Sequence, residues 1–196
     1  MDDFFNIWKV SDESVELFDC NASLEIKPEL RGKKPRYFVG RSDAMIAMIS
    51  REVQKVTNDF KNKCDQYEGV LYMMHKMTAN GDIIPLYIGK AEKLGKTENL
   101  SENITKGKGK LGRWGHGYAY HIGDLSAVAY KHDKKHQTKK YKDWADLLFK
   151  NHPVIHPEKL VLKEKVFFWM KAWEKGSVGL WKEFGATSLT FLEYLL

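Results

Sequence analysis

The segment that decides the fold runs from Gly69 to Ala91 and reads GVLYMMHKMTANGDIIPLYIGKA. It holds two runs rich in hydrophobic and aromatic residues, one on each side of Asn80-Gly81. Asn-Gly between two such runs is the strongest short-range signal of a β-hairpin. Pro85 lies in the second run and cannot donate a ladder hydrogen bond, which predicts an edge strand or a bulge at that point.

The register of this hairpin follows from its turn. If the Asn-Gly pair forms a two-residue turn, Met74 lies opposite Tyr87 and Tyr72 lies opposite Gly89. Because side chains alternate between the two faces of a strand, Tyr72 and Tyr87 then become diagonal neighbours on one face, about 7 Å apart at Cα. On spacing alone, an ordinary cross-strand aromatic pair also accounts for this arrangement.

The rest of the chain supplies helices and one more strand. Ser42-Asp43 can cap a helix whose hydrophobic residues recur at helical spacing as far as Phe60. A polar helix is expected at 134–150, a strand at 161–170 and a final helix at 187–196. We therefore expect an α/β (α+β) fold, in which a small three-stranded antiparallel sheet is flanked by helices.

Charge divides the chain into an acidic beginning and a basic middle. Residues 1–30 carry eight acidic and two basic side chains, whereas residues 90–142 carry 13 basic and five acidic ones, within a net charge of +6. We expect residues 1–65 to form an acidic, helical N-terminal extension and residues 66–196 to form the main domain. A moderate basic excess permits nucleic-acid binding without demonstrating it.

Composition excludes several classes of protein. The chain has 196 residues, 43% of them hydrophobic, so it can bury a core. Two cysteines, Cys20 and Cys64, are too few and too far apart for a disulfide framework or a cysteine zinc site. The longest hydrophobic runs are about five residues, far too short to span a membrane. These features predict a cytoplasmic protein with no membrane partner.

Lysines gather in two stretches of the basic segment, the second of which includes Tyr130, Tyr141 and Trp144. Such side chains suit contacts with the phosphate backbone of DNA, and a solvated basic helix is the alternative. The candidate DNA-binding residues are Lys106, Lys108, Lys110, Lys134, Lys135, Lys139 and Lys140.

Two short motifs in the hairpin resemble the paired signature of the GIY-YIG nuclease superfamily. They are Gly69-Val70-Leu71-Tyr72 and Leu86-Tyr87-Ile88-Gly89-Lys90-Ala91. In that family, a helix bearing Arg and then His follows, then a strand, then a helix with one essential Glu. The same order recurs here in Arg113 and His116, the strand expected at 161–170, and Glu193. The resemblance spans residues 69–196.

The chain also departs from compact members of that family. The 26 residues from Tyr87 to Arg113 exceed the family's usual spacing, which implies insertions at about 91–112 and 115–160. The family's histidine commonly lies one residue further from the arginine than His116 does, so His121 is a rival. Many members carry an Asn beyond the Glu helix, whereas this sequence ends three residues after Glu193. Either this member lacks that Asn or the sequence is a fragment.

The resemblance implies a role for each motif residue in phosphodiester hydrolysis. Glu193 would bind one Mg²⁺ or Mn²⁺, hard ions that prefer oxygen ligands. Its neighbours in sequence are apolar, so a buried carboxylate there would be costly without a partner; Glu174 and Glu183 are weaker candidates. Arg113 would clamp the scissile phosphate with its planar guanidinium.

The remaining motif residues would handle protons and water. Tyr72 would act as general base, which requires nearby cations to depress the ordinary phenol pKa of about 10. Tyr87 would orient the water, and Lys90 would bind phosphate or hold Tyr72 as a phenolate. His116 would relay a proton, because the histidine pKa lies near neutrality.

The expected function is therefore a divalent-metal-dependent DNA endonuclease, with sequence-specific duplex cleavage of the restriction type as first choice. A duplex cutter with one site per chain must make two incisions, which favours a homodimer. The alternatives are a structure-selective or nicking repair or homing nuclease, and a non-catalytic DNA-binding module. The last would keep the lysines but would not need Tyr72, Arg113 and Glu193 together.

Overall fold

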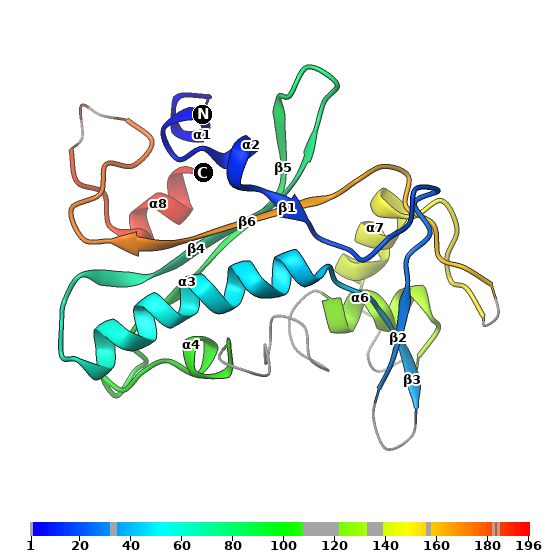
Figure 1. Ribbon diagram of the computed structural model, residues 1–196, viewed down its shortest axis with the longest axis horizontal. Helices are drawn as coiled ribbons and strands as arrows, with labels where there is room; N and C mark the ends of the chain where they lie inside the picture. Colours follow the sequence, from blue (N-terminus) through cyan, green and yellow to red (C-terminus); the bar gives the residue numbers. More distant parts are fainter. Residues whose placement is uncertain are drawn as a thin grey trace.

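Antiparallel strands in the order β1-β6-β4-β5 form the central sheet of this computed structural model, and β2 pairs with β3 in a second, two-stranded sheet (Figure 1). The structure describes residues 2–31, 35–107, 122–132, 139–155, 158–181, 183 and 185–196. The strands are β1 (Val15–Glu16), β2 (Pro28–Arg31), β3 (Arg36–Val39), β4 (Tyr67–Met77), β5 (Ile83–Glu92) and β6 (Phe167–Glu174). The described helices are α1 (Asp2–Ile7), α2 (Val10–Glu13), α3 (Asp43–Lys61), α4 (Glu102–Gly107), α6 (Ile122–Ala129), α7 (Lys139–Leu148) and α8 (Leu189–Leu195).

The expected α+β class is confirmed, but the expected three-stranded sheet is wrong in its strand count. β1 adds a fourth strand, with Val15 opposite Phe168 and Glu16 opposite Phe167. Two residues are too few to show an alternating pattern, so only long-range pairing reveals this strand. The last strand also begins at Phe167 rather than at residue 161, because Val161 forms an isolated bridge with Glu25 instead.

The β4–β5 hairpin has the predicted register at its motif end and a different turn. Thr78 N donates to Asp82 O at 2.9 Å, so three residues, not two, form the loop. Gly81 lies in that loop with φ 88°, a left-handed conformation that glycine adopts readily. The longer loop shifts the pairing by one residue relative to a two-residue turn.

A bulge beside Pro85 cancels that shift. Met74 pairs with Tyr87 but the next residue, His75, pairs with Pro85, which leaves Leu86 as the extra residue. β5 is an edge strand of the described sheet, so the missing N–H of Pro85 costs no ladder bond to a further strand. The edge and bulge predicted from Pro85 are both confirmed, and beyond the bulge Tyr72 pairs with Gly89 as predicted.

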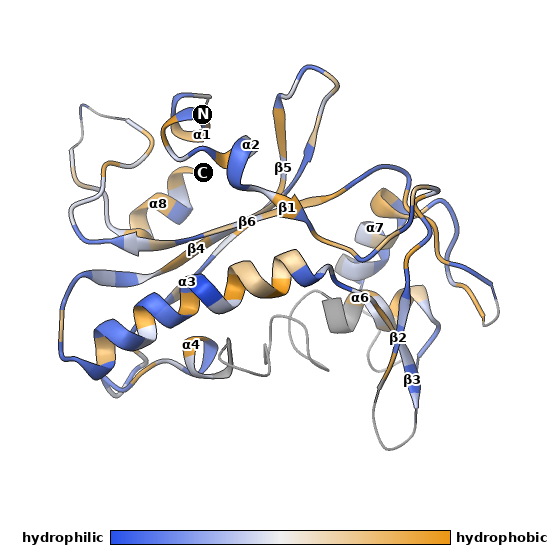
Figure 2. Cartoon of the chain, viewed as in Figure 1, coloured by the Kyte–Doolittle hydropathy of each residue, from blue (hydrophilic) through white to orange (hydrophobic). Residues whose placement is uncertain are grey.

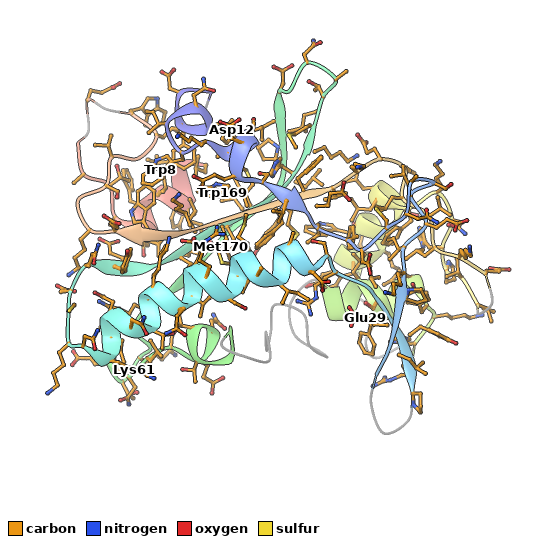
Figure 3. All side chains as sticks on the ribbon, viewed as in Figure 1. Trp8, Asp12, Glu29, Lys61, Trp169 and Met170 are labelled. Atoms are coloured by element: carbon orange, nitrogen blue, oxygen red, sulfur yellow. The ribbon has the colours of Figure 1, made fainter. Side chains whose placement is uncertain are left out.

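Each face of the central sheet is covered by its own hydrophobic cluster. On one face, Tyr72, Met74 and Met170 pack with residues of α3, α6 and α7. On the other, Leu71 and Trp169 pack with α1 and α8. Trp169 and Met170 are neighbours on β6 and belong to different clusters (Figure 3). The sheet is therefore the middle layer between two sets of helices.

Helix α3 begins as the sequence predicted. The Ser42 hydroxyl accepts a hydrogen bond from Met45 N at 3.0 Å and so caps the helix. Along the helix, hydrophilic and hydrophobic residues alternate (Figure 2), and Ile49, Val53 and Val56 are buried against the sheet. The N-terminal segment thus contributes to both clusters, while its separation from residues 66–196 as an extension stays a prediction.

Acidic side chains of the N-terminal segment pair with lysines that come late in the chain. Glu13 pairs with Lys171 at 2.9 Å, and Glu25 pairs with Lys159 at 2.7 Å. These partly exposed pairs each contribute little to stability. They nevertheless neutralise part of the acidic segment locally. Among the helices of the described ranges, none has both the length and the apolar character required to cross a membrane.

A histidine lies fully buried in β4. The Ser14 hydroxyl donates to Val10 O, so it accepts at 3.1 Å from Nε2 of His75, which assigns the ring proton to Nε2. Nδ1 of His75 is buried and has no hydrogen-bond partner among the residues that the structure describes. Burial lowers the pKa of His75 to about 4, because a charged ring would lose its hydration.

We expect this histidine to make the protein less stable in mild acid. The unfolded chain binds a proton below pH 6.5 and the folded chain only near pH 4, so the free energy of unfolding falls as pH decreases between these values. The predicted loss is about 3 kcal/mol. Urea titrations at several pH values measure it, and His75→Gln, which keeps a donor for Ser14 but does not titrate, should flatten the curve. Parallel curves for the two proteins would contradict the prediction.

Candidate active site

The two motif tyrosines lie together on one face of the hairpin. Tyr72 on β4 and Tyr87 on β5 have ring centroids 5.9 Å apart, as expected for diagonal neighbours. Tyr72 is buried, with only 2% of its surface exposed, and its ring packs against Phe168 at 6.4 Å. Tyr87 is half-buried and meets Trp144 of α7 at 5.8 Å. The sheet and α7 therefore hold both phenol rings in defined positions.

Gly89 makes room for the Tyr72 hydroxyl. A Cβ placed on Gly89 would lie 2.4 Å from the Tyr72 oxygen and 2.8 Å from the Tyr87 ring. No side chain can be accommodated there unless the phenols move. The glycine of the Tyr87-Ile88-Gly89 motif is thus explained by packing: it lets the phenol of Tyr72 cross the edge strand directly over the backbone.

A carboxylate of β4 holds the N-terminus of α8. The Glu68 side chain accepts a hydrogen bond from Leu189 N at 2.6 Å, and the Ser188 hydroxyl accepts from Phe191 N at 3.3 Å. Negative charge at a helix N-terminus is favourable, because the unpaired backbone N–H groups there carry partial positive charge. Next to Glu68, Gly69 has no side chain, and a Cβ there would lie 2.8 Å from Leu189. Glu68 and Gly69 together allow α8 to dock closely on the sheet.

A second contact joins α8 to β5. The Lys90 ammonium donates to the Thr190 hydroxyl at 2.6 Å and to Glu92, and Thr190 donates to Glu92 at 2.9 Å. The hydrogen bonds from Lys90 and then Thr190 lower the pKa of the Glu92 carboxyl below its ordinary value. The Lys90 side chain is 16% exposed, so this cation is held in place rather than free in solvent.

Glu193 lies on the same helix, three residues after Thr190. Residues at this spacing are neighbours on a helix surface, so Glu193 lies about one helical turn beyond Thr190 on the same side of α8. Its side chain is half-buried and makes no hydrogen bond or ion pair with any residue of the described ranges. A carboxylate in the last turn of a helix also faces the negative end of the helix dipole. The Glu193 carboxylate therefore makes no contact with the described residues that stabilises the fold. Its oxygens are available to bind a ligand.

The surroundings of Glu193 differ from the apolar setting expected from sequence. Leu189 and Leu192 are buried against the sheet, but Phe191 is 53% exposed and Tyr194 is 86% exposed. The hydrophobic residues of α8 thus do not enclose the carboxylate on most sides. In the described part of the chain, His, Cys, Asp and Glu form no group of three or more that could bind a metal. A half-buried, unpaired carboxylate fits a hard divalent ion that takes its other ligands from water and phosphate.

The structure brings the candidate residues together in two groups. Tyr72 and Tyr87 lie on the face covered by α3 and α7, whereas Lys90 contacts α8, which packs on the other face. The two groups thus lie on opposite faces of the sheet, and β5 contributes Tyr87 to one group and Lys90 to the other. The contacts of the Lys90 ammonium described here are with Glu92 and Thr190, not with the Tyr72 phenol.

Several candidates lie outside the described residues. These are Arg113, His116, its rival His121, Lys108, Lys110, Lys134 and Lys135. Lys106 and Lys140 belong to the backbone of α4 and α7, and Lys139 is exposed at the start of α7. The structure therefore positions four of the six candidate catalytic residues.

Sequence reasoning missed the side chains that dock α8, namely Glu68, Glu92 and Thr190. Glu68 precedes the first motif and Glu92 follows the second, so proximity to the motifs was the available signal. Their partners lie about a hundred residues away, beyond any local pattern. No model of a known protein family, no curated protein and no solved structure matches this chain. The resemblance to the GIY-YIG superfamily therefore stays a prediction from the motif residues of the sequence.

Proposed function

We propose that this protein is a DNA endonuclease of the GIY-YIG type, which hydrolyses phosphodiester bonds with a divalent metal ion bound at Glu193. The observation that carries the proposal is the placement of Tyr72 over Gly89, with the Tyr87 ring 5.9 Å from the Tyr72 ring. This packing accounts for both tyrosines and the glycine of the paired motif at once. A cross-strand aromatic pair by itself would not require glycine at that position.

In this proposal, each candidate residue has its own role in hydrolysis. The Tyr72 phenolate takes a proton from the attacking water while Tyr87 orients that water. Arg113 and Lys90 bind the phosphate oxygens, and Lys90 is already held towards α8 by Thr190. His116 delivers a proton to the oxygen that leaves phosphorus. A Mg²⁺ or Mn²⁺ ion at Glu193 would supply Lewis-acid stabilisation of the phosphate charge.

The proposed substrate is duplex DNA, cut at specific sequences as restriction enzymes do. The basic residues in and around the two proposed insertions support a nucleic-acid substrate, since phosphate contacts by lysine and arginine dominate such affinities. With one site per chain, two chains would act together as a homodimer on a duplex.

Cleavage assays test the proposal directly. Plasmid and labelled duplex, nicked and branched DNA are incubated with the protein in Mg²⁺ or in EDTA. We expect Mg²⁺-dependent cutting, with discrete fragments from plasmid if duplex sequence is recognised. Tyr72→Phe should lower the rate about a hundredfold or more, the usual contribution of a general base, while DNA binding persists. A protein that binds DNA but cuts none of these substrates would refute the nuclease proposal.

A further inference from the structure

Two partners of different kinds hold the ammonium group of Lys90. It donates to the Thr190 hydroxyl at 2.6 Å and to Oε1 of Glu92. Thr190 donates to the same oxygen of Glu92 at 2.9 Å, so the three side chains form a closed ring of hydrogen bonds. Thr190 is neutral and belongs to α8, whereas Glu92 is charged and is the last residue of β5. The two contacts therefore respond differently when another anion approaches Lys90.

The two members of the ion pair are unequally exposed. The Lys90 side chain is 16% exposed, whereas the Glu92 side chain is 52% exposed. An ion pair with one half-exposed member contributes little to stability, because water screens the attraction. A side chain that lies half in solvent also loses few contacts when it rotates. Glu92 is therefore the partner that a competing anion can displace at low cost.

Two hollows in the protein surface border Glu92. One has a volume of about 250 Å³, and its lining includes Lys90, Glu92 and Ser101. The other has a volume of about 260 Å³, and its lining includes Glu92, Thr190 and Lys175. A water molecule in the liquid occupies about 30 Å³, so each hollow exceeds it several-fold. The first hollow has room for a phosphate group beside Lys90, and the second has room for a rotated Glu92 carboxylate near the cation of Lys175.

A phosphate of DNA would compete with Glu92 for the same ammonium. The Lys90 ammonium carries three N–H donors, and Thr190 accepts from one of them. While Glu92 is in place, its charge compensates that of Lys90 and repels an approaching phosphate. Once the carboxylate has turned away, the other donors are available to phosphate oxygens. The exchange replaces one charge-assisted hydrogen bond with another, so its net cost is small.

We infer that Glu92 holds the Lys90 ammonium in the protein without DNA, and that a phosphate of the DNA backbone takes the place of Glu92 when the duplex binds. Thr190 keeps its contact, so Lys90 stays attached to α8, which carries Glu193 and packs on β4 and β5 (Figure 1). Glu92 is thus a positioning residue that orients Lys90 before binding and competes with the substrate. The inference rests on the proposed nuclease function, which assigns Lys90 to a phosphate of DNA.

The test measures the affinity for a labelled duplex in EDTA, where no metal-dependent cleavage takes place. Glu92→Gln keeps the shape of the side chain and an acceptor oxygen but removes the competing charge. It should bind the duplex about fivefold more tightly than wild type, a factor that corresponds to the upper range for an exposed ion pair. If Glu92 served only to orient Lys90, the same change would weaken binding.

A double-mutant cycle shows whether Glu92 acts through Lys90. Lys90→Met keeps the length of the side chain without its charge. In that background, Glu92→Gln should change the affinity by less than about twofold, because no ammonium remains to be released. The matched control is Glu98→Gln, which removes an exposed carboxylate from the loop after β5. It should also change the affinity of the otherwise wild-type protein by less than about twofold.

Several outcomes would overturn the inference. These are an affinity of Glu92→Gln equal to or below that of wild type, an equal gain from Glu98→Gln, and an undiminished gain in the Lys90→Met background. Cleavage in Mg²⁺ is measured separately. The expected coupling without cleavage would refute the nuclease proposal alone, whereas cleavage without this coupling would refute only the exchange at Lys90.

Discussion

Replacing Glu193 with glutamine is expected, on the proposed nuclease function, to reduce DNA cleavage about a thousandfold or more, equivalent to some 4 kcal/mol of transition-state stabilisation. Glutamine has nearly the same shape but no charge, so it would bind a divalent ion far more weakly. Because Glu193 makes no hydrogen bond or ion pair with the described residues, the fold should tolerate the change. Unfolding free energy should stay within about 0.5 kcal/mol of wild type.

The measurements are the rate of duplex cleavage across a range of Mg²⁺ and Mn²⁺ concentrations, and urea unfolding. A matched control is Glu183→Gln, which removes an exposed carboxylate that precedes α8 in the chain. Glu183 was a weaker candidate ligand, and its replacement should leave cleavage unchanged. If Glu193→Gln cut DNA at the wild-type rate, Glu193 would not be the metal ligand.

Replacing Lys93 with methionine is expected to destabilise the protein by about 3–5 kcal/mol, the usual cost of leaving one member of a buried ion pair alone. The Lys93 ammonium lies 2.8 Å from the Asp59 carboxylate, and the two side chains are 7% and 2% exposed. Asp59 also accepts hydrogen bonds from the backbone N–H groups of Gln66 and Tyr67, at 3.0 and 3.2 Å. Methionine keeps the length of the side chain but leaves Asp59 without its cation.

The pH dependence of this effect identifies its cause. Burial by itself would raise the pKa of Asp59, but the hydrogen bonds from Lys93 and the two backbone amides outweigh it and lower that pKa. In wild type, this carboxylate therefore stabilises the fold above its unfolded pKa, and the contribution disappears as pH falls through the folded pKa. Without Lys93, protonation of Asp59 should relieve the burial of charge. The difference between the two proteins should thus shrink in acid.

Two further variants complete this experiment. Lys175→Met removes one of the two lysines that pair with Asp65, the other being Lys93 at 3.3 Å. The Lys175 and Asp65 side chains are 48% and 71% exposed, so this change should cost less than about 1 kcal/mol. Asp59→Asn combined with Lys93→Met removes both buried charges and should be more stable than Lys93→Met alone. Similar destabilisation by Lys93→Met and Lys175→Met would show that burial of the pair is not the cause.

The hairpin shows how far local patterns predict structure. Asn80-Gly81 and the alternating residues predicted the pairing of Tyr72 with Gly89, and the structure has that pairing. The turn differs from the expected one. The three-residue loop shifts the register by one residue, and the bulge at Leu86 shifts it back by one, so the two effects cancel. Tyr72 and Met74 pack in the cluster that includes α3, and a shift of one residue would move both to the opposite face, into the cluster of Leu71 and Trp169. The register at the motif end is therefore the one that these two packed faces require, although the turn differs from the expected one.

The candidate site contains contacts that such local patterns do not predict. The sequence predicted Lys90 and Glu193 as members of one site, but no local feature indicates that Lys90 binds Thr190 or that Glu68 caps α8. The Glu68–Leu189 contact joins residues 121 positions apart in the chain. Contacts of this kind depend on which faces of α8 and the sheet become buried together, and many pairings are compatible with the same sequence pattern.

The sequence by itself determined the elements whose signals are local: the capped helix α3, the β4–β5 hairpin with its tyrosine pair, and the final helix that carries Glu193. Periodicity, caps and turn residues act over a few positions, so they can be read directly. Only the tertiary structure decided that β1 joins the sheet, that α8 docks on the face opposite Tyr72, and that β2 and β3 form a separate two-stranded sheet. Those outcomes depend on hydrophobic burial and hydrogen bonds between distant segments, whose partners are defined only when the whole chain packs.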